Sequence, residues 1–344
     1  MHARALALSW LCWGLLCGPL GAQNRPVSKV GTTAAAFLEI GVGARAQGLG
    51  GAFVALANSA EALYWNPAGL AQLSAHEAFL THSRWLAELT FDYLGVALRL
   101  DPWGTLGVSV TRLGMPEMLV RTEDRPEGTG EWFGASDLAV GLSYGRPITD
   151  RFSIGFTVKY IEQRIWHTSA VGFAADLGTQ FRTDFFGGLV IGASITNFGT
   201  DMRLSGRDLR VFVDPDPRQL GNNSRIPANL ETEAWSLPVH FQVGVATTAL
   251  RTPFHRLSLA ADAVYPSSNY QSLNGGLEYS FRDRLWLRLG YQNALLRDGE
   301  GGFSWGLGLL QPLPYPRGRA RIDYAYRAFG RLGAVHVLSL GVSF

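Results

Sequence analysis

The last ten residues, Val335 to Phe344, read VHVLSLGVSF. Successive side chains of a strand point to opposite faces, so this segment has a wide apolar face and a face of small, mostly polar side chains. The apolar face carries His336, Leu338, Leu340, Val342 and Phe344, and the other carries Val337, Ser339, Gly341 and Ser343. A C-terminal strand that ends in an aromatic residue is typical of outer-membrane barrels. It predicts that the chain upstream consists of more such strands.

The same period of two recurs along the chain. Between Phe152 and Tyr160, for example, every second residue is apolar, with Ser, Gly, Thr and Lys between them. Many segments of about ten residues with alternating hydrophobicity are the signature of a transmembrane barrel. We therefore predict an all-β fold, an antiparallel transmembrane β-barrel of about fourteen strands. The expected strands are 79–84, 94–100, 106–110, 138–144, 152–160, 171–181, 189–195, 239–245, 257–265, 273–281, 285–291, 303–309, 322–326 and 336–344.

The connections between these strands sort by length. With both ends of the barrel on the periplasmic side, the periplasmic connections are all short, at 101–104, 146–151, 182–184, 251–254, 282–284 and 311–318. The long connections 114–136 and 197–236, together with 294–302, fall on the other side. Short periplasmic turns with longer outer loops are the rule for this architecture, whereas a soluble sandwich has no reason to sort its loops this way.

The composition limits the partners. Charged residues make up 17% of the chain, below the roughly 25% of soluble domains. The formal net charge of +2 gives no bulk attraction to nucleic acid. Residues 1–22 are expected to be a signal peptide, with an apolar core at 5–16 and a small-residue cleavage site before Gln23. Both cysteines lie in that segment, so we expect no disulfide or thiolate metal site, and no cofactor, in the exported protein.

Residues 23–75 break the strand pattern and are predicted to form a compact plug inside a barrel that spans 76–344. The segment is rich in glycine and alanine and is too small to hold its own core. A helical stretch is expected from Ser59 toward Trp65, ending before Pro67, because proline disfavours a helical conformation at the residue before it. A barrel of this size leaves room for such a plug.

Charged residues recur on the less hydrophobic face of the strands. An Arg or Lys that faced lipid near the midplane would cost roughly 2–4 kcal/mol, so these side chains must point into the lumen. The signs are balanced, which favours an internal salt-bridge network, with a selectivity ring for charged solutes as the alternative. The lumenal charges are predicted to include Lys159, Asp176, Arg288, Arg319, Arg321 and Asp323, together with Arg99, Asp137, Asp262 and Glu278.

The outer connection 197–236 is long and rich in charge and proline. Loops beyond about 15 residues are usually functional or disordered. We interpret it as a candidate surface for another protein, against the alternative of a solvated loop. The residues expected to contact a partner are Arg207, Arg210, Asp214, Arg218 and Arg225.

No catalytic motif is convincing. The sequence Gly141-Leu142-Ser143-Tyr144-Gly145 matches G-x-S-x-G, but it lies within a strand and not at a strand-to-helix turn. Gly41-x-Gly43-x-x-Ala46 fits a loose dinucleotide fingerprint but has no βαβ unit around it. The seven histidines show no metal-ligand spacing. We therefore expect the protein not to be an enzyme.

Three blocks near the N-terminus resemble the PorV/PorQ family of outer-membrane proteins. These are residues 34–46 (AAAFLEIGVGARA), 50–55 (GGAFVA) and 62–71 (ALYWNPAGLA). Later segments resemble it too, at 148–155, 176–178, 195–199 and 323–326. The element Asn66-Pro67-Ala68-Gly69 within the third block is also similar to that of the wider fatty-acid channels of FadL type, which are fourteen-stranded barrels closed by an N-terminal hatch.

The resemblance implies two functions. PorV-like members serve the type IX secretion system, bind the C-terminal signal domains of cargo at the cell surface and associate with other secretion components. On this hypothesis the chain is an outer-membrane interaction protein, surrounded by lipid, whose outer loops hold cargo. The alternative is a FadL-like channel that takes hydrophobic small molecules past a mobile plug.

Overall fold

Fourteen long strands form a closed antiparallel β-barrel in the computed structural model, which describes residues 30–216, 218, 223, 225–296, 299, 302–314 and 318–344. The predicted strand count and fold class are confirmed, and each expected strand overlaps one of the fourteen. They are β1 (Glu77–Arg84), β2 (Thr90–Leu100), β3 (Gly104–Gly114), β6 (Ala135–Pro147), β7 (Phe152–Ile165), β8 (Thr168–Arg182), β9 (Val190–Gly199), β15 (His240–Arg251), β16 (His255–Pro266), β17 (Ser272–Phe281), β18 (Leu285–Ala294), β19 (Phe303–Pro312), β20 (Arg319–Ala328) and β21 (Ala334–Ser343).

The barrel closes between its first and last strands. β1 pairs with β2 on one side and with β21 on the other, in a register that places Leu80 opposite Leu340. His76 and Phe344 extend this seam, since each backbone N–H donates to the carbonyl oxygen of the other, at 3.1 and 3.0 Å. The wall therefore leaves no strand edge open at the junction of its two ends.

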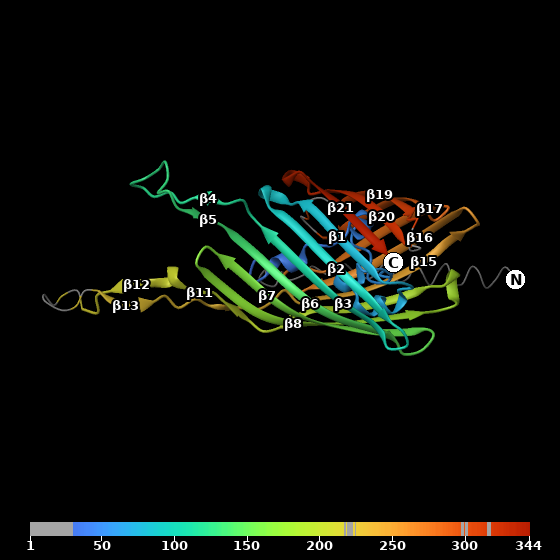
Figure 1. The fold of residues 1–344 in the computed structure, drawn as a ribbon, viewed down its shortest axis with the longest axis horizontal. Coiled ribbons are helices and arrows are strands. Elements are labelled where there is room, and N and C mark those ends of the chain that lie inside the picture. Colours follow the sequence, from blue (N-terminus) through green and yellow to red (C-terminus); the bar gives the residue numbers. More distant parts are fainter. Residues whose placement is uncertain are drawn as a thin grey trace, which may run out of the picture.

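The two ends of the barrel differ, as Figure 1 shows. The turn end holds the short connections and the start of β1. The loop end holds the long connections, which contain the short ribbons β4–β5 (Met118–Leu119, Trp132–Phe133), β10–β14 (Met202–Arg203, Ala234–Trp235) and β12–β13 (Arg210–Val213, Ile226–Asn229). β11 (Ser205–Gly206) pairs with β8. Short 3-10 turns lie at Leu86–Glu88, Phe185–Gly187, Arg207–Leu209 and Gly330–Leu332.

One turn is longer than the sequence pattern indicated. The connection between β8 and β9 was expected at 182–184, but β8 runs to Arg182 and β9 begins only at Val190. A 3-10 turn, Phe185–Gly187, fills this gap, and Phe186 there adopts φ 49° and ψ 44°. The next strand was expected at 189–195, and β9 does begin close to that position, at Val190.

The wall has an apolar exterior and a polar interior. On β2, Leu94 and Leu98 face outward and are 47% and 44% exposed, while Tyr93 and Ala97 point inward and are buried. The exterior of the other strands is similar. Soluble proteins rarely expose so large a continuous apolar surface to water. The outside is therefore suited to lipid. Within the described residues, no helix has the length and apolarity needed to span a membrane.

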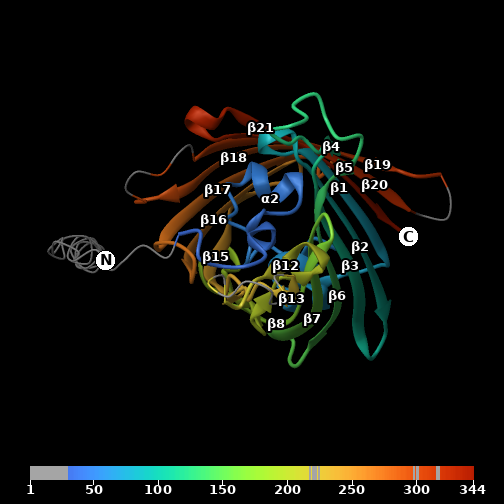
Figure 2. The ribbon, with the colours of Figure 1, turned by 90° about the vertical axis from the view of Figure 1, so that its left-hand side faces the viewer.

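Residues 30–75 lie inside the barrel, where Figure 2 shows them from the loop end as the blue segment. They form η1 (Ala36–Glu39), α2 (Ala44–Gly48), α3 (Ala62–Trp65) and η2 (Pro67–Gln72). We call this segment the plug. The helix expected from Ser59 is shorter than predicted and begins at Ala62. The expected signal peptide at 1–22 lies outside the described residues.

The plug braces the two halves of the wall. α2 packs against β18, β19, β20 and β21, whereas η2 packs against β3, β6, β7 and β8. Many of its apolar residues, among them Leu49, Phe53, Leu63 and Leu70, are fully buried. The plug is too small to form a hydrophobic core of its own, so its apolar side chains are buried against one another and against the inner face of the barrel wall.

Candidate functional site in the barrel lumen

The plug backbone lies directly against glycines of the wall. A Cβ atom at Gly155 of β7 would come within 2.1 Å of the Pro67 carbonyl carbon, and one at Gly178 of β8 within 2.1 Å of Asn66 Oδ1. No real side chain tolerates such distances, so close approach of the backbone requires glycine at both positions. Other wall glycines that a Cβ would bring into conflict with the plug are Gly95, Gly107, Gly145, Gly192, Gly276 and Gly290.

The predicted plug motif sits on this surface. Asn66 Nδ2 donates to the carbonyl oxygens of Val54, at 2.9 Å, and of Thr179 in β8, at 3.1 Å. Its Oδ1 accepts from Ala68 N at 3.1 Å, which caps η2 after the extended backbone of Asn66. Pro67 opens that turn, and Gly69 packs against Ala57, whose carbonyl oxygen would lie 2.1 Å from a Cβ. The motif therefore ties two parts of the plug to each other and to the wall.

Polar side chains of the wall hold the extended part of the plug. Asp262 Oδ2 accepts hydrogen bonds from Phe53 N, at 2.7 Å, and Val54 N, at 2.9 Å. Gln180 Nε2 donates to the carbonyl oxygen of Ala57 at 2.8 Å, and Gln242 Nε2 to Asp262 at 2.7 Å. The sequence pattern placed Asp262 in the lumen but did not reveal that it binds plug backbone.

Six charged side chains form one continuous chain across the plug–wall boundary, which we call the charge ladder. Within the wall, Arg288 contacts Glu278 at 2.8 Å and Asp323 at 2.7 Å, and Arg321 contacts Asp323 at 2.6 Å. Both ends lie on the plug, where Arg45 contacts Glu278 at 2.9 Å and Glu61 contacts Arg321 at 2.7 Å. No member is more than 18% exposed in its side chain.

Arg288 of β18 reaches Asp323 of β20 across the intervening strand β19, so the inward face of β19 must be free of side chains at this point. Arg288 lies opposite Gly306 of β19, and Asp323 lies opposite Gly308. A Cβ atom at Gly308 would stand 2.5 Å from Asp323 Oδ1 and 2.9 Å from both Arg288 Nη atoms. Glycine at this position leaves room for the arginine to reach across the strand.

The remaining predicted lumenal charges lie elsewhere. Lys159 and Asp176 form a separate buried pair at 2.7 Å, and Asp176 also accepts from Asn197 N at 2.8 Å. Arg319 has the inward parity of β20 but is exposed at the turn end. Arg45 and Glu61 were not identified from sequence, although they are the two charged residues between positions 40 and 75.

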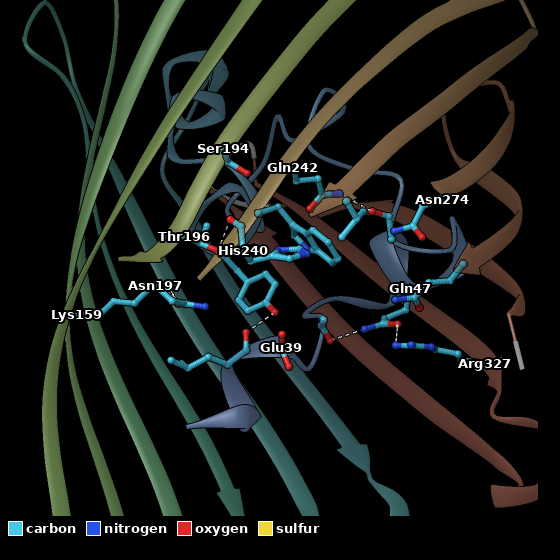
Figure 3. Close-up of a pocket in the computed structure, with 17 residues that line it drawn as sticks. Glu39, Gln47, Lys159, Ser194, Thr196, Asn197, His240, Gln242, Asn274 and Arg327 are labelled. Carbon is cyan, nitrogen blue, oxygen red and sulfur yellow. Dashed lines mark hydrogen bonds between the residues drawn. The ribbon is translucent and has the colours of Figure 1, made fainter. Parts of the chain in front are cut away.

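A small polar cavity remains between plug and wall (Figure 3). Its volume is about 70 Å³, enough for a few water molecules. Polar side chains of both partners point into it, including Glu39, Gln47, Lys159, Asn197, His240 and Arg327. This cavity can hold water or a small polar solute, but it offers no path for an apolar molecule.

A larger groove opens at the loop end, beside the first described residues of the plug. Its volume is about 570 Å³, within the range of pockets that bind small molecules. We call it the loop-end groove. Its lining is formed by Gly31, Thr33, Ala34, Gln163, Ala170, Met202, Leu204, Thr232, Glu233 and Trp235.

The predicted partner-contacting residues lie along the outer connection. Arg207 lies beside the barrel, where its Nη2 contacts the His167 ring at 2.8 Å. Arg210 lies in the β12–β13 ribbon, which projects beyond the barrel in Figure 1, and Asp214, Arg218 and Arg225 follow toward its tip. Four of the five therefore belong to the segment that carries this ribbon, in which Val213 pairs with Ile226, whereas Arg207 lies next to the barrel wall.

The residues of the rejected motifs have structural roles. Ser143 is 1% exposed on β6, and its Oγ bonds Thr157 Oγ1 at 2.8 Å. Among the described residues, no group of His, Cys, Asp or Glu could hold a metal ion.

Comparisons with known proteins agree with the barrel. The model of an uncharacterised protein family (UPF0164) matches residues 22–207. No curated protein matches the chain.

Several solved outer-membrane channels share the fold. The CymD monoaromatic hydrocarbon channel has a TM-score of 0.56 at 13% identity, over 89% of this chain and 98% of that chain. A Pseudomonas aeruginosa FadL homologue (0.52, 10%) and the Ralstonia pickettii toluene transporter TbuX (0.52, 12%) each cover 88% of this chain, over 98% and 97% of their own. At these identities the likeness concerns the fold, which is that of a FadL-like outer-membrane barrel.

Proposed function

We propose that this chain, which belongs to the uncharacterised protein family UPF0164, is an outer-membrane channel protein that takes up small hydrophobic molecules. The loop-end groove carries the proposal, because it has a volume of about 570 Å³ beside the plug and a lining that is half apolar, with Ala34, Ala170, Met202, Leu204 and Trp235. The shared fold supports it, since proteins described as a monoaromatic hydrocarbon channel and a toluene transporter have the same barrel.

The groove has the chemistry that an apolar ligand requires. Met202 and Ala170 are almost fully buried at 2% and 5% exposure, Leu204 is half-buried, and Trp235 is exposed at 46%. Burial of apolar surface contributes about 25 cal/mol per Å², so an aromatic or aliphatic molecule gains free energy on leaving water for this site. Thr33, Gln163, Thr232 and Glu233 provide polar groups that can orient it.

Uptake of labelled compounds tests this proposal. Cells that lack their own hydrophobic-molecule channels, and express this protein, are expected to accumulate radiolabelled toluene or a long-chain fatty acid faster than cells with an empty vector. Leu204→Glu introduces a charge into the groove and should reduce uptake at least fivefold. The matched control is Leu230→Glu, at an exposed position of the same connection outside the groove. Equal uptake by expressing and non-expressing cells would refute the channel.

A second candidate is the PorV/PorQ-type role in type IX secretion, in which the outer loops bind cargo. The specific observation in its favour is the projecting β12–β13 ribbon, on which Phe212 is 72% exposed beside Arg210. Exposed aromatic and arginine side chains are the types that dominate protein interfaces. Deletion of residues 207–225 should abolish capture of secreted cargo while the barrel keeps its heat-modifiable migration. Undiminished capture would exclude this role for the ribbon.

A further inference from the structure

A second groove crosses the outer face of the wall over β17 to β20, beside the turn end. Its volume is about 550 Å³, and we call it the wall groove. Four leucines form its floor on the two central strands. Leu285 pairs with Leu309 and Leu287 pairs with Leu307, and each of the four is about half exposed. The floor is therefore a flat apolar surface that faces lipid.

Larger side chains border this floor. Tyr279 and Phe281 stand on β17, opposite Leu287 and Leu285, and Tyr324 stands on β20, opposite Leu307. Trp305 is the next outward residue of β19 after Leu307, and its ring lies 5.5 Å from that of Tyr324. The four residues from Leu309 to Trp305 span about 13 Å at about 3.4 Å per residue. The groove thus has the shape of a short channel along the strands, which suits a linear hydrocarbon chain.

Two arginines stand at the mouth of the groove. Arg282 and Arg284 belong to the turn that joins β17 to β18, and both are exposed. The Arg282 guanidinium lies over the rings of Phe254 and Phe281, at 5.1 and 5.3 Å from their centres. Arg282 N also donates to Phe254 O at 2.7 Å. Because Phe281 lines the groove, these contacts fix a cation at its turn-end edge.

These arginines have no acidic partner among the described residues. Asp283, which lies between them, contacts Arg256 of the neighbouring turn at 2.9 Å. The turns on this side of the barrel, at 251–256 and 282–284, hold four arginines and one aspartate. The segments 99–101, 146–151 and 182–184, on the other side, hold four arginines and three aspartates. Positive charge at the turn end is therefore concentrated beside the wall groove.

We propose that the wall groove binds an anionic phospholipid of the leaflet at the turn end, with an acyl chain on the leucine floor and the phosphate at Arg282 and Arg284. The planar guanidinium matches the geometry of a phosphate group. Aromatic residues mark the membrane interface of barrels, where head groups lie, and Phe254, Tyr279 and Phe281 stand at this level. The proposal concerns the outside of the wall, so it holds whether or not the lumen conducts.

The charge carries the selectivity of this site. Lipid tails are as apolar as leucine, so an apolar floor alone would not prefer one lipid to another. The groove contributes packing, because a chain between raised borders contacts more atoms than one on a flat wall. The arginines then favour a negatively charged head group over a neutral one, as basic pockets at membrane surfaces do.

Native mass spectrometry of the purified protein tests the head group. Dioleoylphosphatidylglycerol and dioleoylphosphatidylcholine have the same chains but differ in net charge, and we expect the first to be retained at least threefold more. Arg282→Gln with Arg284→Gln should remove this preference. The matched control is Arg146→Gln with Arg151→Gln, which removes two exposed turn-end arginines on the other side of the barrel and should keep it. Equal retention of both lipids by the unaltered protein, or equal loss in the two double variants, would overturn the proposal.

Filling the groove tests the chain. Leu287→Trp places a large ring on the floor and should lower retention of dioleoylphosphatidylglycerol at least fivefold, while heat-modifiable migration shows that the barrel folds. Leu98→Trp is the control, because Leu98 is also an outward residue two positions from the turn end of its strand. Unchanged retention by Leu287→Trp would overturn the site. A dimer that only Leu287→Trp abolishes would also overturn it, since a second copy of the chain would then cover the groove.

Discussion

Asn66 of the plug lies directly over Gly178 of the wall, so that a Cβ atom at Gly178 would come within 2.1 Å of Asn66 Oδ1. We predict that Gly178→Val displaces the plug at this point, because the added methyl groups meet packed atoms and not the end of a flexible side chain. Such overpacking costs about 1–3 kcal/mol. Limited proteolysis should then cleave residues 50–70. Gly275→Val, at a position with no atom within 4 Å, should leave the plug resistant.

Loss of the Asn66 amide should also loosen the plug. Asn66→Ala removes two hydrogen bonds to carbonyl oxygens and the cap of η2. Val54 O keeps a hydrogen bond from Gln180 Nε2 at 3.3 Å, but the Thr179 carbonyl loses its bond from the plug, and an unsatisfied buried polar group costs about 1–3 kcal/mol. We expect the free energy of unfolding in urea, measured in lipid vesicles, to fall by that order. Asn229→Ala, at an exposed position of the β12–β13 ribbon, is the control, and an equal loss there would contradict the assignment.

The centre of the charge ladder should be the most sensitive charged position. Glu278→Gln leaves Arg45 and Arg288 without the anion between them, and breaking a buried pair by removing one partner costs about 3–5 kcal/mol. The exposed pair of Arg151 and Asp184 provides the comparison, since Asp184→Asn should cost at most about 1 kcal/mol. Thermal unfolding of the two variants side by side would decide the matter. Similar midpoints would mean that the ladder does not stabilise the barrel.

The lipid-facing side of the closing seam provides a test of the membrane assignment. Leu80 lies opposite both Leu94 and Leu340, and all three are exposed on the outer face. Leu94→Arg should destabilise the folded barrel in bilayers by about 2–4 kcal/mol, as arginine does near the midplane. Met118→Arg, in the outer connection, should have no such effect. If both variants fold equally well, this face does not contact lipid.

The strands could be predicted from sequence because each carries its own evidence. In β7, the alternation from Phe152 to Tyr160 specifies both the strand and the face that turns inward, whatever its neighbours are. The order of the strands follows from the short connections, because a short turn places two consecutive antiparallel strands side by side. The length of the β8–β9 turn was underestimated because the 3-10 turn at Phe185–Gly187 has no alternating pattern that marks where the turn ends.

The partners within the lumen could not be predicted in this way. Arg45 bonds Glu278 across 233 residues of sequence, and Glu61 bonds Arg321 across 260, so no local pattern links them. Parity places Glu278 and Arg321 inside the barrel but cannot say which plug residue each will meet. A signal was nevertheless present in the glycines, since Gly145, Gly155 and Gly178 fall on the inward face of three adjacent strands and lie in register.

The course of the plug through the lumen also has a mechanical consequence. Its first residues are fixed at the loop end, where Ala34 N donates to Ser236 O at 2.9 Å and Ala35 N to Gln163 Oε1 at 2.8 Å. Its last residues join β1 at the turn end, where His76 bonds Phe344. The polypeptide is therefore threaded through the ring that it closes. Withdrawal of the plug toward the turn end therefore requires Ala34 and Ala35 to release Ser236 and Gln163 at the loop end. A partner that held these two residues from outside would keep the plug in the lumen.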